Sequence, residues 1–125
     1  MPNPIVFSVI ESPLHPNFSN LYKEYGLEEV RFNSMRKVLA ALKQTIPVYL
    51  FAEFFYGYGN NYAGANISNL DVLLRSLQKY APNTKVIVFV DKKERQYVDK
   101  LFDLFPLFHV FTLPVTKDEM LTTLT

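Results

Sequence analysis

The chain contains short, nearly continuous apolar runs separated by longer segments whose apolar residues recur at helical spacing. Four runs are rich in β-branched and aromatic residues, and they span residues 5–10, 48–54, 85–90 and 108–113. A weaker run, EEVRF at residues 28–32, follows Gly26. Apolar runs without alternation are typical of parallel strands that are covered on both faces. The pattern therefore predicts five strands in a parallel sheet.

Helical segments are predicted between these strands. The first begins at about Asn17, behind two prolines, and the second places its apolar residues on one face after a cap at Asn33 or Ser34. Three more begin with the capping-box pattern, at Ser68 with Asp71, Asp91 with Glu94, and Thr116 with Glu119. Five strands that alternate with five helices predict right-handed βαβ units and a doubly wound α/β sheet.

Composition narrows the function classes. The 125 residues fit a single domain spanning 1–125. Thirteen basic and twelve acidic residues leave a formal charge of +1, too small a field to attract nucleic acid or an anionic membrane. The absence of cysteine excludes disulfides and thiolate chemistry. No secretory signal and no run of membrane-spanning length is found, so we expect a cytoplasmic protein.

The second half of the chain carries a family resemblance. In residues 81–124 a proline-led loop enters an apolar strand, and the next helix opens on acidic and basic residues. The last strand ends in LPVT before a short helix. These features resemble a response-regulator receiver domain (CheY-like), and length and element order fit over almost the whole chain. The resemblance implies a flavodoxin-like (βα)5 fold with strand order 2-1-3-4-5.

Receiver domains carry their chemistry at the carboxyl edge of the sheet. An acidic pair binds magnesium, an aspartate accepts the phosphoryl group, and a hydroxyl and a lysine stabilise its oxygens. This sequence departs from that pattern at nearly every corresponding position: Ile10 and Glu11 for the acidic pair, Ala52 beside Glu53 for the acceptor, Val90 or Asp91 for the hydroxyl, and Leu113 and Pro114 for the Lys-Pro pair. Glu53 reaches the pocket only if its strand bulges. The resemblance therefore indicates a degenerate pseudo-receiver, with no catalytic residue, metal or cofactor.

The same edge contains residues that are suited to other chemistry. Glu11, His15 and Glu53 are suitable ligands for a transition metal and suitable groups for acid–base catalysis. The interpretation of all three as ordinary surface residues is favoured. The glycine-rich GYGNNY segment at residues 57–62 lacks the third small residue of a dinucleotide fingerprint and the Gly-Lys pair of a Walker loop.

The connection at residues 54–67 is longer than an ordinary βα loop, and loops of this length are often functional. Aromatic and amide side chains of the kind used by adaptable binding surfaces are concentrated in it, and they make up a candidate binding loop: Phe54, Phe55, Tyr56, Tyr58, Asn60, Asn61 and Tyr62. Two interpretations stay open. The aromatic residues either plug the emptied pocket or contact a partner, and the two roles are compatible.

The favoured hypothesis is a stand-alone receiver-like module of signalling that acts by contact with a partner protein or by homodimerisation, and is not an enzyme. Receivers commonly pair through the face made by helix 4, strand 5 and helix 5, which implies a candidate interface of Tyr97, Lys100, Leu101, Phe108, Phe111 and Met120. The alternative is a domain that binds a small ligand or nucleotide in the crevice under residues 54–67. An enzyme that uses Glu11, His15 or Glu53 ranks third.

Overall fold

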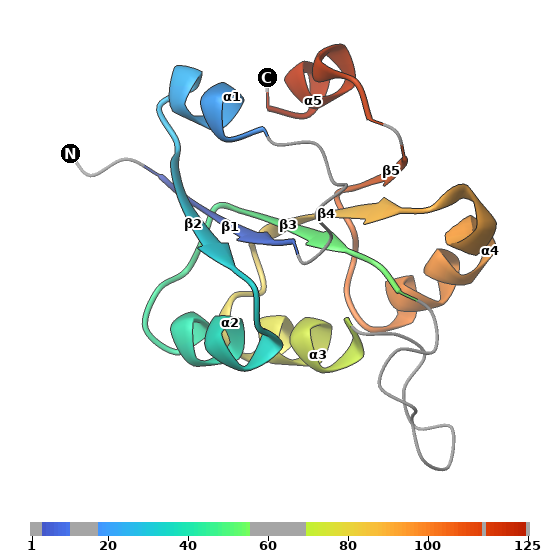
Figure 1. The fold of residues 1–125 in the computed structure, drawn as a ribbon. Coiled ribbons are helices and arrows are strands. Elements are labelled where there is room, and N and C mark those ends of the chain that lie inside the picture. Colours follow the sequence, from blue (N-terminus) through green and yellow to red (C-terminus); the bar gives the residue numbers. More distant parts are fainter. Residues whose placement is uncertain (1–3, 11–17, 56–69, 114, 125) are drawn as a thin grey trace.

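The computed structural model describes residues 4–10, 18–55, 70–113 and 115–124, which build a five-stranded parallel sheet (Figure 1). The strands are β1 Ile5–Val9, β2 Glu28–Phe32, β3 Tyr49–Glu53, β4 Lys85–Val90 and β5 His109–Thr112. They lie in the order β2-β1-β3-β4-β5. The predicted strands agree with the observed ones to within one residue at each end. The flavodoxin-like topology is confirmed.

Helices cover both faces of this sheet (Figure 1). They are α1 Ser19–Glu24, α2 Met35–Leu42, α3 Asp71–Tyr80, α4 Arg95–Val98 and α5 Lys117–Leu124. α1 and α5 lie on one face, here the α1/α5 face, and α2 and α3 lie on the other, the α2/α3 face. This doubly wound arrangement is the one that right-handed βαβ connections produce.

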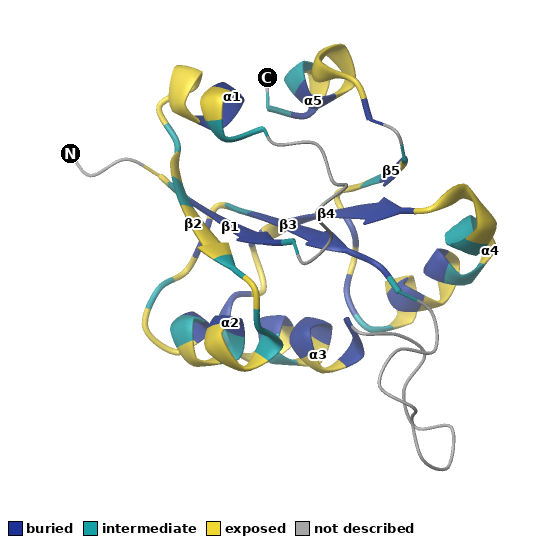
Figure 2. Cartoon of the chain, viewed as in Figure 1, coloured by how far each residue is buried: buried dark blue, intermediate teal, exposed yellow. Residues whose placement is uncertain are grey.

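The core consists of two apolar layers, because successive side chains of a strand point to opposite faces. In β3, Phe51 joins the layer under α1 and α5, whereas Leu50 and Ala52 join the layer under α2 and α3. Phe51, Phe89 and Phe111 stack across three adjacent strands with ring centroids 5.9 Å apart at each step. Figure 2 shows the central strands buried along their length, whereas the edge strand β2 is largely exposed.

The segment after β4 differs from the continuous helix that was predicted. Lys92–Glu94 and Asp99–Asp103 form 3-10 turns on either side of α4, which is four residues long. Val98 and Leu101 are fully buried in the core. The segment therefore packs on the sheet through these two side chains.

The predicted helix starts have different outcomes. At α5 the capping box is confirmed, because the Thr116 amide donates to Glu119 Oε1 (3.1 Å) and the Glu119 amide donates to Thr116 Oγ1 (3.2 Å). Asp91 caps the first 3-10 turn by accepting a bond from the Lys93 amide at 2.9 Å. Ser34 is the N-cap of α2 but makes no side-chain capping bond. α3 begins at Asp71, and Ser68 lies outside the described residues.

Candidate functional site

The carboxyl edge of the central strands is apolar where a receiver is polar. Ala52, at the acceptor position, is fully buried, and the register places it between Val9 of β1 and Val88 of β4. Val90, at one of the two positions considered for the hydroxyl residue, is also fully buried. The other, Asp91, is exposed and caps the following turn. Ala52 and Val90 are thus packed hydrocarbon side chains, and neither offers an oxygen ligand to a cation.

Glu53 stays in register with its neighbours. Pairing runs without interruption from Ala52 with Val88 to Glu53 with Phe89, so β3 has no bulge there. The strand alternation places Glu53 on the same side of the sheet as Phe51, opposite to Ala52. Glu53 is the last residue of β3 and is buried, with 4% of its surface exposed, so its interpretation as an ordinary surface residue is wrong. The bulge that would bring its carboxylate to the acceptor position is therefore absent.

Other predicted site residues border this edge or lie outside the described residues. Ile10 and Leu113 are half-buried and pack against the α1/α5 layer. Phe54 is buried in the opposite layer, its amide donates to the Phe89 carbonyl at 2.8 Å, and Phe55 is half-buried. The remaining residues fall outside the described part of the chain: Glu11, His15, Tyr56, Tyr58, Asn60, Asn61, Tyr62 and Pro114. Among the described residues, no group of three His, Cys, Asp or Glu side chains could hold a metal ion.

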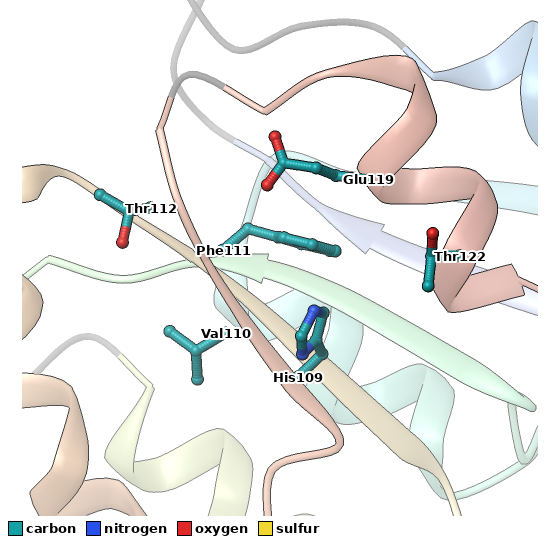
Figure 3. Close-up of a pocket in the computed structure, with 6 residues that line it drawn as sticks. All are labelled: His109, Val110, Phe111, Thr112, Glu119 and Thr122. Carbon is teal, nitrogen blue, oxygen red and sulfur yellow. The ribbon is translucent and has the colours of Figure 1, made fainter.

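The second predicted region, the face formed by α4, β5 and α5, contains an open groove of about 390 Å³ (Figure 3). His109 and Phe111 line it from the side of β5 that faces α5, and Glu119 and Thr122 line it from α5. The Glu119 carboxylate accepts from the Thr116 amide and hydroxyl, at 3.1 Å each, so it stabilises the start of α5.

The predicted interface on this face needs a correction. Leu101, Phe111 and Met120 are 0%, 4% and 0% exposed and belong to the core, so they are not available to a partner. The prediction placed these three residues on the surface, although packing of the segment on the sheet buries part of its apolar side chains. The accessible members are these: Lys100 and Phe108, which are exposed, Tyr97, which is half-buried, and Phe102, which the prediction missed.

A polar cluster that the sequence analysis missed lies on β1 and β2, at the side of the sheet opposite to β5. Ser8 of β1 donates to Glu29 Oε2 at 2.7 Å, and Ser19 of α1 donates to Glu29 Oε1. Arg31 donates from a guanidinium nitrogen to Ser19 Oγ at 3.3 Å. Tyr22 is hydrogen-bonded to Ser8, and burial, followed by the nearby Glu29 carboxylate, raises the pKa of its hydroxyl far above the ordinary value. The cluster ties α1 to β1 and β2.

Comparison with known proteins agrees with this architecture. No family model and no curated protein matches the chain. Among solved structures, a response regulator from Thermotoga maritima superposes with a TM-score of 0.72 at 16% identity, covering 96% of this chain and 92% of that one. A Francisella response-regulator receiver domain gives a TM-score of 0.71 at 15% identity over 98% and 93% of the two chains. A protein described as an adenylate cyclase from Rhodopirellula baltica gives 0.68 at 10% identity over 98% and 84%.

At these identities the likeness establishes the fold alone. The chain has the flavodoxin-like fold of response-regulator receiver domains, with the same five-stranded sheet order and helices on both faces. No helix among the described residues is both long and apolar enough to span a membrane.

Proposed function

We propose that this protein is a receiver-like signalling domain that is not phosphorylated and acts through protein contact or self-association. The observation that carries the proposal is the apolar carboxyl edge, where Ala52 and Val90 are fully buried. A phosphoryl group needs an oxygen nucleophile and a cation there. The residues at these two positions supply neither. The receiver fold supports a role in signalling, and the altered edge supports loss of the phosphorylation switch.

The test of the first part uses beryllofluoride, a mimic of the phosphoryl group, in the presence of Mg²⁺. We expect no saturable change in the amide NMR resonances of residues 52–54 and 90–91. The physical reason is that no aspartate stands at the acceptor position to coordinate the beryllium. Saturable changes confined to these residues would contradict the proposal.

The surface proposed for protein contact is the accessible part of the face formed by α4, β5 and α5. Phe102 and Phe108 expose 47% and 48% of their surface, and Lys85 places its ammonium 5.1 Å from the centre of the Phe108 ring. Aromatic side chains are enriched in interfaces. β5 is also the last strand of the sheet. The Phe108 amide bonds to the Val86 carbonyl, so the backbone groups of His109 and Phe111 point outward.

A pair of variants tests this surface. Phe108→Ser removes the aromatic ring from it, and Ile46→Ser removes an apolar side chain that is 65% exposed in the loop before β3. Self-association is measured by sedimentation velocity, and partner capture by pull-down from native lysate. We expect Phe108→Ser, but not Ile46→Ser, to weaken the interaction. A monodisperse monomer at high concentration together with an empty pull-down would contradict this part of the proposal.

A further inference from the structure

An open pocket of about 310 Å³ lies where β1 and β2 end, and neither Ala52 of β3 nor Val90 of β4 lines it. Its walls are Ile10, Arg31, Phe32 and Asn33. The register pairs Val9 with Phe32, so Ile10 and Asn33 directly follow neighbouring strand ends. The carboxyl ends of parallel strands are where open α/β sheets bind ligands. The pocket has the location and, at the low end, the volume of a small-molecule site.

The guanidinium of Arg31 is the charged group of this pocket. It bonds to the Ser19 hydroxyl and forms no ion pair with a carboxylate of the described residues. The nearby Glu29 carboxylate already accepts from Ser8 and Ser19, one serine on each oxygen. A guanidinium has five N–H donors in a planar fork that matches carboxylate and phosphate oxygens. Arg31 therefore keeps donors for a further acceptor.

The serine bonds also orient Arg31. Ser8 and Ser19 both hold Glu29, and Ser19 in turn accepts from Arg31. These hydrogen bonds link the guanidinium to Ser8, which is buried, with 2% of its surface exposed. A side chain oriented before binding loses less conformational freedom when a ligand arrives.

The charged residues that follow the pocket in the chain are positive, like Arg31. α2 starts two residues after Asn33, and its first turn contains Arg36 and Lys37 but no acidic residue. Both are exposed. Ile10 and Phe32 add apolar walls to the pocket. Together these features suit a ligand with an anionic head and an apolar body.

We propose that this pocket binds a small oxyanion ligand, a phosphate monoester or a carboxylate. Arg31 forms the fork contact with the anion, Asn33 donates from its amide, and Ile10 and Phe32 contact the apolar part. Ser19 is a positioning residue that acts through Arg31. The proposal does not depend on the proposed function, because that function is argued from Ala52 and Val90, and neither residue lines this pocket.

NMR titration of the full chain tests it, with four probes at constant ionic strength: inorganic phosphate, phenyl phosphate, acetate and benzoate. We expect saturable shifts of the Ile10 and Asn33 amides and of the Arg31 Nε–H resonance. Each aromatic probe should bind more tightly than its small counterpart. The better of the two aromatic probes identifies the head group, phosphate or carboxylate.

Variants separate a specific site from general attraction of anions. Arg31→Gln should weaken binding about tenfold or more, the loss expected for a hydrogen bond to a charged group. Ser19→Ala keeps the cation and should weaken binding less. Lys43→Gln removes the same charge at the far end of α2, and its affinity should stay within about twofold of the parent's, because exposed charges at that distance are screened.

The Arg31→Gln spectrum away from the pocket should match the parent spectrum, since Arg31 is exposed. If that variant is unfolded, Asn33→Ala provides the same comparison. Shifts that grow without saturation for all four probes would overturn the proposal. So would equal affinity of the parent and Arg31→Gln.

Discussion

Two regions of the sheet differ in character. Near the carboxyl ends of β3 and β4, the positions that correspond to the acceptor and hydroxyl residues of a receiver hold the apolar residues Ala52 and Val90, both fully buried. Across β1, β2 and α1, the sheet instead holds hydrogen-bonded polar groups around Glu29 and an open pocket beside Arg31. In receiver domains, the residue that accepts the phosphoryl group lies in the first region. In this protein Ala52 and Val90 of the first region belong to the core, whereas the second region carries polar groups.

The position of each strand explains the difference. β3 and β4 have a neighbour on both sides and helices on both faces, so a charge there needs its own partners and access to water. β2 is the edge strand, and most of its residues keep contact with solvent. Glu29 and Arg31 are accommodated there without a buried unpaired charge. Apolar residues such as Ala52 and Val90 are therefore favoured at the centre of the sheet.

The largest effect is expected from a charge placed in the apolar region. Ala52→Asp buries a carboxylate between Val9 and Val88, and we expect the free energy of unfolding to fall by about 3 kcal/mol or more. Urea denaturation measures it. Ala40→Asp, at an exposed position of α2, is the matched control and should cost about 1 kcal/mol or less. Equal stability of Ala52→Asp and the parent would show that the central edge is open to water.

A smaller effect is expected in the polar region. Glu29→Ala removes the acceptor of the Ser8 and Ser19 hydroxyls, of which Ser8 is buried. We expect a loss of about 1–3 kcal/mol in the free energy of unfolding. Glu28→Ala, at an exposed position of the same strand, should change it by about 0.5 kcal/mol or less. If both variants lose the same small amount, the serine bonds contribute nothing to stability.

The last effect depends on pH. Because burial raises the pKa of Tyr22 above the ordinary value of 10.0, the unfolded chain releases this proton at lower pH than the folded chain does. The contribution of Tyr22 to stability is therefore complete below about pH 10 and decreases above it, by about 1.4 kcal/mol per pH unit. Tyr22→Phe should lose this part of the alkaline dependence, and exposed Tyr25→Phe should keep it. Urea denaturation as a function of pH distinguishes them, and identical curves for all three proteins would contradict the account.

Much of the fold could be predicted from the sequence, because buried parallel strands leave continuous apolar runs such as KVIVFV at residues 85–90. The capping box of Thr116 and Glu119 could also be predicted, because its hydrogen bonds join residues that are close in sequence. Packing against distant parts of the chain decides which apolar residues between 95 and 111 face the core. That is why Leu101 and Phe111 were assigned to a surface.

The polar cluster was missed because its members are distant in sequence. Ser8 is the one polar residue of the apolar strand β1. Glu29 and Arg31 are two residues apart in the neighbouring strand β2, so their side chains lie on the same face of the sheet. A search for a lone polar residue in a buried strand, with charged residues in the neighbouring strand, would have indicated it. The register that brings Ser8 beside Arg31 is a tertiary property, and neither segment contains it alone.

The central claim is that the ends of β3 and β4 no longer support phosphoryl transfer. Incubation with acetyl phosphate and Mg²⁺, followed by intact-mass spectrometry at neutral pH, tests it most directly. We predict an unchanged mass. One added phosphoryl group on Glu53 or Asp91, removed by hydroxylamine as an acyl phosphate is, would contradict the claim.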